Sequence, residues 1–349
     1  MPPDSLPRQV IIVNAGAISP LVNLLSVGVL EVKKEVSRAL MNLSLRSLST
    51  QLAIAASLVA LLGTGTAEAQ EHVGLLLLTL ADDADNLAAI SKTGAIRGLV
   101  LQMKGNDKHT SVKAQELAAA VLSHLSQASD GNVDTIAANN GIRSLVALLS
   151  SESSVAQAKA SAVLGDLARR STRNKNLILA EGAVPILVNL INDRTRNEQT
   201  NQWKETPSAT RAEAAGALQF LASGQPDTQR LVAEAGALKR LVALLDLDDQ
   251  YVRQRGAGAI AALCKENTEN QDAVESYSGI LKLVSLLDPG LAADVLRSYV
   301  ACALSVLASG NRKIQEKVAS AGGVEPLVRL LDEPTASRAK EEVIASDGL

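Results

Sequence analysis

The residues best able to do chemistry in this sequence are three histidines and two cysteines, and their spacing builds no catalytic or metal site. The histidines stand 37 and 15 residues apart, and no cysteine or carboxylate cluster completes a zinc-ligand pattern around His72, His109 or His124. Cys264 and Cys302 fall at core-like spacing, where cysteine behaves as a small hydrophobe. We therefore expect no metal site, no cofactor and no catalytic residue.

Short motifs for phosphate binding and nucleophilic catalysis do not occur either. GTGTAE at residues 63–68 has two glycines but lacks the Lys-Ser/Thr that a phosphate-binding loop requires. The sequence contains neither G-x-S-x-G nor H-E-x-x-H. An enzyme is not expected, and the function must come from the elements that the remaining residues build.

The composition favours helices packed through small residues. Of 349 residues, 47% are hydrophobic but only 1% aromatic, so Ala, Leu, Val and Ile supply the core. A net charge of −3 argues against a nucleic-acid-binding surface. Two cysteines fit a reducing compartment, and the apolar run 52–63 is too short to span a bilayer. We expect a soluble cytoplasmic protein without direct membrane insertion, with the nucleus left open as a second compartment.

A sequence unit recurs along the chain. Residues 16–26 read GAISPLVNLLS, and residues 182–192 read GAVPILVNLIN. The Leu-Val pair inside this unit recurs at spacings of 37 to 54 residues, with its leucines at Leu21, Leu58, Leu99, Leu145, Leu187, Leu241, Leu283 and Leu327. A glycine stands four or five residues before most of these pairs, at Gly16, Gly94, Gly141, Gly182, Gly236, Gly279 and Gly322, and the second copy has none. Such a period is typical of helical solenoids.

Each copy predicts three helices. A short polar-led helix such as 227–235 comes first, a glycine then permits a sharp turn, and a second helix such as 238–246 carries the Leu-Val pair. A longer third helix follows, such as 252–265, whose Ala and Gly residues permit close helix approach. One unit cannot bury its apolar faces alone, so every copy must present the same faces to its neighbours.

These features resemble the armadillo repeat family, in particular its catenin-like and armadillo-repeat-only scaffold proteins. The signature is G-A-[IV]-x-x-L-V-x-L-L followed by A-x-x-A-L-x-N-L-[AS], and EVKKEVSRALMNLS at residues 31–44 matches its second half. The resemblance implies an all-α fold, a right-handed armadillo-repeat solenoid (superhelix) of about eight repeats. It implies a single array over residues 1–349, with approximate units 1–44, 45–82, 83–127, 128–168, 169–222 (insertion about 192–208), 223–264, 265–308 and a partial 309–349.

The resemblance also implies a protein-binding groove along the concave side, lined by the third helices. In family members that bind extended peptides, an Asn near the end of this helix hydrogen-bonds the ligand backbone, and only Asn42 keeps that residue here. The candidate groove residues are Glu35, Arg38, Asn42, His72, Thr79, His124, Lys159, Asp166, Glu213, Phe220, Arg255, Tyr299 and Val306. We expect polar backbone binding at Asn42, and an apolar partner segment over Phe220, Tyr299 and Val306.

The expected function is that of a non-catalytic scaffold or adaptor for protein or peptide segments, with two alternatives. Some plant-type ubiquitin ligases append such repeats to a U-box as a substrate-recruiting arm, although this sequence encodes no U-box. Nuclear-import receptors place a Trp four residues before the Asn row, and that row here reads Arg38, Leu75, Ala120, Ala162, Gly216, Gly258 and Cys302. A nuclear-import cargo receptor is therefore the weaker alternative.

The step of 54 residues between Leu187 and Leu241 marks an insertion. INDRTRNEQTNQWKETPSAT is polar and uneven, and it holds the sole tryptophan, Trp203. Long loops of this kind are often functional or disordered. Two interpretations stay open, because Trp203 either folds back on the solenoid or serves as an exposed anchor for a partner.

Overall fold

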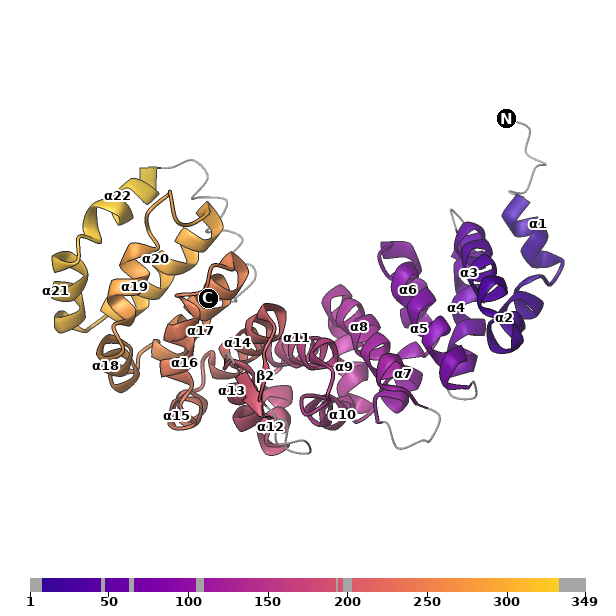
Figure 1. Ribbon diagram of the computed structural model, residues 1–349, viewed down its shortest axis with the longest axis horizontal. Coiled ribbons are helices and arrows are strands. Elements are labelled where there is room, and N and C mark those ends of the chain that lie inside the picture. The colour runs from indigo at the N-terminus through magenta and orange to yellow at the C-terminus, as the bar shows by residue number, and fades with distance from the viewer. Residues whose placement is uncertain are drawn as a thin grey trace. The chain divides into compact units, whose positions relative to one another are not determined.

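The computed structural model describes residues 8–44, 48–62, 66–104, 110–192, 194–196 and 203–332, and the chain divides into two units (Figure 1). Unit 1 comprises residues 1–163 and unit 2 residues 164–349, and the division falls within α11 (Ser154–Arg170). Within each unit, successive helices pack against their neighbours along the chain.

The helices recur in groups of three. Unit 1 holds α1 (Arg8–Asn14), α2 (Ile18–Val27), α3 (Leu30–Ser44), α4 (Leu48–Leu62), α5 (Ala67–Leu80), α6 (Ala84–Lys92), α7 (Ala95–Met103), α8 (Val112–Ala128), α9 (Asp130–Ala138), α10 (Gly141–Leu148) and the start of α11. Unit 2 continues with α12 (Thr172–Ala180), α13 (Ala183–Leu190), α14 (Ser208–Ala222), α15 (Pro226–Glu234), α16 (Ala237–Leu244), α17 (Gln250–Cys264), α18 (Thr268–Ser276), α19 (Gly279–Ser285), α20 (Asp294–Ala308), α21 (Arg312–Ser320) and α22 (Val324–Asp332). The third helices of the repeats are α3, α5, α8, α11, α14, α17 and α20. The predicted all-α solenoid is confirmed.

Polar residues begin the first helix of each repeat. Their side chains accept a hydrogen bond from the backbone N–H three residues later, at Asp83, Ser129, Ser171, Asn267 and Asn311. Each such cap satisfies one of the N–H groups that the first helical turn leaves without an intrahelical partner. A capping side chain thus sets the start of five of these helices, whereas α15 begins at Pro226 with no side-chain cap.

The turn between first and second helices requires a left-handed residue. Glycine takes it with φ between 76° and 83° at Gly16, Gly94, Gly182, Gly236 and Gly322. Glycine adopts this region without the steric cost that a Cβ imposes. The glycine that recurs in the sequence unit therefore serves the backbone turn at these positions.

Gly141 does not make this turn, contrary to its placement among the turn glycines. Asn140 takes the left-handed conformation instead, with φ 62°, and Gly141 is the first residue of α10. A Cβ on Gly141 would stand 2.5 Å from the carbonyl oxygen of Ile136. The glycine is needed there because the chain passes too close to the preceding helix for a side chain. Ser278 and Gly279 repeat the same arrangement before α19.

The second copy replaces its first two helices with one. No glycine precedes Leu58 at the turn position, and α4 runs unbroken from Leu48 to Leu62. Ile54 and Leu58 on this helix are fully buried. Without a residue that favours the left-handed turn, continued helix is the lower-energy path.

Within the described ranges, no single helix is long and apolar enough to cross a bilayer. One bent pair, Arg8–Asn14 with Ile18–Leu25, meets the length and composition requirement jointly, with a bend of 79°.

One side-chain contact recurs between consecutive repeats of unit 2. The valine of the Leu-Val pair packs against the residue that follows the left-handed turn of the next repeat, which we call the post-turn residue. A Cβ added to the post-turn Gly279 would lie 3.1 Å from Val242 Cγ2, and one added to Gly323 would lie 3.0 Å from Val284 Cγ2. Small post-turn residues therefore let one repeat stack closely on the next.

Carboxamides on the first helices tie together the ends of third helices. Gln271 Nε2 donates to Cys264 O at the end of α17 (3.2 Å) and to Val306 O in α20 (3.3 Å). Its Oε1 accepts from Asn311 Nδ2 of the following repeat at 3.2 Å. The Cys264 and Val306 carbonyls each also accept from a backbone N–H, that of Asn267 and of Ser309 respectively, so Gln271 adds a second donor to each carbonyl and links the two helix ends.

The insertion contains a short β-hairpin. Strand β1 (Arg194–Arg196) pairs antiparallel with β2 (Trp203–Glu205), and Arg196 stands opposite Trp203. After the hairpin, Arg211 Nε donates to Thr206 O at 2.7 Å, and both side chains are buried. The described part of the insertion is thus a local β addition joined closely to α14.

Leu187→Ala should destabilise unit 2 by about 2–5 kcal/mol, because it removes buried methyl groups and leaves a cavity. Leu187 is fully buried, whereas Leu177 on α12 is 42% exposed. Leu177→Ala is the matched control and should change stability by less than about 0.5 kcal/mol. Urea denaturation of both variants tests the register, and equal losses would contradict it.

Gln271→Ala should cost about 0.5–1.5 kcal/mol, because it removes the side-chain bonds that link two third helices while each carbonyl keeps a backbone donor. Gln315→Ala is the control, since among the described residues its Nε2 donates to Ala308 O alone (2.9 Å), at an exposed position. Hydrogen exchange should show faster opening at the ends of α17 and α20 in Gln271→Ala alone. The tie between third helices is refuted if both variants exchange alike.

Candidate functional site

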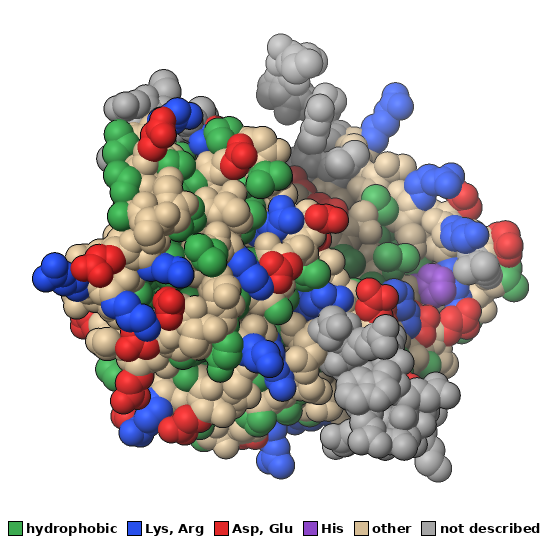
Figure 2. Space-filling model, turned by 60° about the vertical axis from the view of Figure 1, so that its left-hand side comes forward, with side chains coloured by type: hydrophobic (Ala, Val, Ile, Leu, Met, Phe, Trp, Pro, Cys, Tyr) green, Lys and Arg blue, Asp and Glu red, His purple; other side chains and the backbone are tan. Residues whose placement is uncertain are grey.

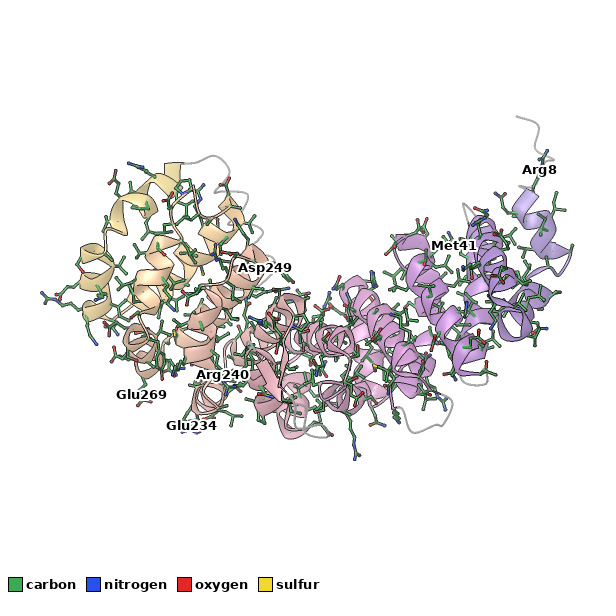
Figure 3. The ribbon with its side chains drawn as sticks, in the orientation of Figure 1. Arg8, Met41, Glu234, Arg240, Asp249 and Glu269 are labelled. Carbon is green, nitrogen blue, oxygen red and sulfur yellow. The ribbon has the colours of Figure 1, made fainter. Side chains whose placement is uncertain are left out.

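The third helices pack side by side within each unit and form what we call the third-helix face. In unit 1, α5 contacts both α3 and α8; in unit 2, α17 contacts both α14 and α20 (Figure 1). Figure 3 shows Asp249, at the start of α17, on the edge of unit 2 away from Glu234 and Glu269, which lie on α15 and α18. The predicted groove residues all lie on third helices and are divided between unit 1 and unit 2.

Unit 1 presents its predicted site residues to solvent. Glu35, Arg38 and Asn42 are exposed on α3. The remaining four are half-buried, namely His72 and Thr79 on α5, His124 on α8 and Lys159 on α11. The face of unit 1 is therefore open to a ligand.

Most of these polar side chains are held by their own helix. Arg38 Nη1 donates to Glu35 Oε2 at 3.2 Å, and Thr79 Oγ1 donates to Leu75 O at 2.9 Å. The Nδ1 atoms of His72 and His124 lie 2.8 and 3.0 Å from backbone carbonyl oxygens four residues earlier. These short-range bonds orient the side chains without covering them.

A buried lysine joins the first two third helices. Lys33 Nζ on α3 lies 2.9 Å from Glu68 Oε2 on α5, and the Lys33 side chain is only 2% exposed. The hydrogen bond from Lys33, together with its charge, holds the pKa of the exposed Glu68 below its ordinary value of 4.5. The pair fixes the spacing of α3 and α5 at one end of the face.

Two large apolar side chains lie exposed on the same face. Met41 on α3 is 37% exposed and Leu75 on α5 is 55% exposed (Met41 is labelled in Figure 3). In the repeat register, Met41 and Leu75 correspond to Gln219 and Gly258 of unit 2, which touch each other across α14 and α17. Met41 and Leu75 therefore lie on adjacent third helices, α3 and α5, which contact each other.

Unit 2 differs because the apolar residues that were predicted to contact a ligand are mostly buried between its own helices. Phe220 and Tyr299 are only 8% and 6% exposed, and Val306 is half-buried. The Phe220 ring packs on Gly165 of α11, and the Arg169 guanidinium carbon lies 5.9 Å from the ring centroid. The expected apolar ligand surface over these residues is largely used by the fold itself.

Glycines explain why this part of the face is filled. Gly216 and Gly258 stand where nuclear-import receptors carry Trp, and long side chains from the adjacent third helix lie against them. Arg255 approaches the position of a Gly216 Cβ to 3.4 Å, and Gln219 Oε1 approaches that of Gly258 to 2.7 Å. The Gln219 Oε1 atom is buried and has no hydrogen-bond partner among the described residues. Close packing has thus replaced an aromatic wall.

Glu213, Tyr251 and Arg255 form a polar cluster between α14 and α17. Tyr251 Oη donates to Glu213 Oε1 at 2.9 Å and accepts from Arg255 Nη2 at 2.8 Å. Burial raises the pKa of Tyr251, with Arg255 opposing the rise. Burial alone would lower the pKa of Arg255, but Tyr251 and Glu213 outweigh it and raise that pKa. The side chains of Glu213 on α14 and Arg255 on α17 are therefore engaged in bonds with Tyr251 and are less available to a ligand.

Asp166, Cys264 and Trp203 add little evidence for a binding or catalytic site. Asp166 lies 3.9 Å from Arg169 on the same helix. Burial strongly raises the pKa of the Cys264 thiol, which keeps it protonated and inert. The side chain of Trp203 lies outside the described residues, so its anchor role stays a prediction. No group of histidine, cysteine and carboxylate side chains suited to a metal ion is found in the described ranges.

Comparison with known proteins finds a matching repeat family and solved structures with a similar fold. The Armadillo/beta-catenin-like repeat family matches residues 4–45. The crystal structure of an engineered protein superposes with a TM-score of 0.72 at 28% identity, over 97% of this chain and 80% of that one. A second engineered protein gives 0.62 at 27% identity, over 73% and 99% of the two chains.

A designed armadillo repeat protein, solved in complex with a (KR)4 peptide, gives a TM-score of 0.59 at 20% identity, over 72% of this chain and 98% of that one. The chain resembles armadillo repeat proteins, because the family model matches one repeat and the engineered and designed proteins share its fold. No curated protein matched in the same search.

Sequence reasoning missed Met41 as a surface residue. The available signal was a comparison of registers, because every other third helix except α5, which has Leu78, places Ala, Gly, Ser or Gln at that position. A large apolar side chain on a face that is otherwise polar or small is informative, whereas a single exposed Leu is not.

Tyr251→Phe should destabilise the protein by about 0.5–1.5 kcal/mol, because Arg255 and Glu213 lose their shared partner. Tyr277→Phe is the control, since Tyr277 is equally exposed at 41% and its hydroxyl bonds to no other described residue. Urea denaturation measures both. Equal stability of the two variants would show that the cluster does not hold α14 to α17.

Proposed function

We propose that this protein is a non-catalytic scaffold that binds a segment of a partner protein on the third-helix face of unit 1. The observation that carries the proposal is the exposure of Met41 and Leu75 on adjacent third helices. Desolvating both would contribute binding free energy, since buried apolar area is the main favourable term in association. The polar side chains around them supply orientation.

Asn42 supports an extended segment as the ligand. It is exposed at the end of α3, and it is the residue that family members use to hydrogen-bond a peptide backbone. A carboxamide can donate to one backbone carbonyl and accept from one amide, which an extended strand leaves unpaired. The similar designed armadillo repeat protein with a bound (KR)4 peptide is an example of this use of the fold.

Surface charge does not single out one ligand charge. Figure 2 shows Lys and Arg side chains interspersed with Asp and Glu over the face in view. On unit 1, Glu35 and Arg38 pair with each other. Selectivity should therefore depend on the apolar anchor and on backbone hydrogen bonds more than on net charge. We place the protein in the cytoplasm as part of this proposal.

Phage-displayed random peptides selected on the immobilised protein provide a test without a known partner. Synthetic copies of the selected peptides should bind about tenfold or more weakly to Leu75→Glu and to Met41→Glu, because a carboxylate would be desolvated in the contact. Calorimetry on folded protein measures the affinities.

Leu177→Glu is the matched control, because Leu177 is similarly exposed at 42% but lies on the first helix α12. It should leave peptide affinity unchanged. Selected peptides that bind all three variants as tightly as the parent would move the binding surface away from unit 1's third-helix face. Asn42→Ala should weaken binding less than the apolar variants, by loss of one or two hydrogen bonds.

A further inference from the structure

Two histidines on the third-helix face of unit 1 are held through the same ring nitrogen. His72 Nδ1 lies 2.8 Å from Glu68 O, and His124 Nδ1 lies 3.0 Å from Ala120 O. A carbonyl oxygen only accepts hydrogen bonds, so in each neutral ring Nδ1 carries the hydrogen and Nε2 carries the lone pair. Helix geometry therefore fixes Nε2 of both neutral side chains as a hydrogen-bond acceptor.

The surroundings of Nε2 differ between the two histidines. His124 Nε2 lies 3.6 Å from Asp82 Oδ1, so a proton that binds there completes an ion pair within the chain. The His72 ring has no hydrogen-bond or ion-pair partner among the described residues other than Glu68 O. Nε2 of His72 is therefore available to a ligand, whereas Nε2 of His124 is directed at Asp82.

His72 lies beside the apolar residue on which the proposed function rests. His72 and Leu75 are three residues apart on α5, so they share one side of the helix. Leu75 is 55% exposed and His72 is half-buried, and a segment that covers Leu75 would also cover the imidazole. In that contact a neutral Nε2 can accept a hydrogen bond from an N–H of the segment. A protonated Nε2 would lose this bond and would bring a positive charge into a contact that excludes water.

We propose that His72 makes ligand binding on the third-helix face of unit 1 dependent on pH, with the neutral imidazole as the binding form. This inference rests on the proposed function. The ligand is a segment that places an apolar side chain over Met41 and Leu75 and a hydrogen-bond donor, such as a backbone N–H, at His72 Nε2. Binding is strongest above the range in which histidine titrates, and it weakens as the pH falls through that range.

The other charged groups around α5 must be separated from His72. The hydrogen bond from Lys33, together with its charge, holds the pKa of Glu68 below 4.5, so Glu68 stays ionised where histidine titrates. Neither α2 nor α4, which also pack on α5, carries a charged residue, and α6 with Asp85 and Lys92 begins beyond the end of α5. The remaining charged groups are Lys34, Glu35 and Arg38 on α3, Glu71 on α5, and Lys113 and Glu116 on α8. A substitution at His72 leaves all of them in place.

Calorimetry of phage-selected peptides at about pH 8 and about pH 5.5 tests the proposal, since histidine titrates between these values. The peptides are those whose binding to the parent depends on Leu75, acetylated at the amino terminus and free of histidine. Parent affinity should fall by about tenfold or more at the lower pH. His72→Gln keeps an acceptor that does not titrate, so it should bind with nearly equal affinity at both values. Circular dichroism at both values checks that each protein is folded.

His124→Gln is the matched control, because His124 has the same Nδ1 bond but directs Nε2 at Asp82. It should keep the pH dependence of the parent. Proton release gives a second measurement at about pH 6.5, where the histidine side chain is partly protonated. Binding to the parent should release protons, so its heat should change with the ionisation enthalpy of the buffer. Binding to His72→Gln should not show this change.

Several results would overturn the role of His72. Peptides that need Leu75 but bind the parent equally at both pH values would remove the pH dependence and leave the proposed function intact. Tighter binding at the lower pH would mean that the protonated ring is the binding form. A pH dependence that survives in His72→Gln, or that is lost in His124→Gln, would assign it to another group. Selected peptides that need neither Leu75 nor Met41 would overturn the proposed function and this inference together.

Discussion

Contact between consecutive repeats is the constraint on which the rest of this structure depends. A group of three short helices has more apolar surface than it can cover by folding on itself, so each repeat is completed by its neighbours. The valine of the Leu-Val pair and the small post-turn residue of the next repeat form that contact at Val242 and Gly279. The left-handed turn exists to bring the second helix into this position, and it needs a residue without steric penalty. The sequence repeats because the same interface recurs between each pair of consecutive repeats.

Most of the fold could be predicted from the sequence because this interface has a short, periodic signature. The Leu-Val register correctly placed Leu187 in the core, and the third helices lie where Ala-rich segments predicted them. Deviations arose where two residues can do the same backbone task. Asn140 replaces glycine in the turn, since Asn tolerates the left-handed region better than most residues, and this moved the glycine by one position. In the second copy, no residue suited to the left-handed turn stands at that position, and the single helix α4 takes the place of two.

The candidate site was harder to predict, because exposure on a third helix depends on the side chains of its neighbours. Phe220 and Tyr299 occupy groove positions in the register, yet both are buried, and Phe220 is covered where Gly165 lets α11 approach α14. Met41 and Leu75 stand out because their neighbours on α3 and α5 do not close over them. A register comparison identifies which row a residue belongs to, but only packing volumes decide whether that row is open.

The two units therefore use the same face in different ways. In unit 2, glycines at Gly216 and Gly258 convert the third-helix face into tightly packed structure, reinforced by the Glu213, Tyr251 and Arg255 cluster. In unit 1, an ion pair between the buried Lys33 and the exposed Glu68 joins α3 to α5 while leaving the outer side chains exposed. Stability and recognition compete for the same row of side chains, since a residue that fills the space between third helices is no longer available to a ligand. A solenoid can settle that competition repeat by repeat, because each repeat contacts only its nearest neighbours.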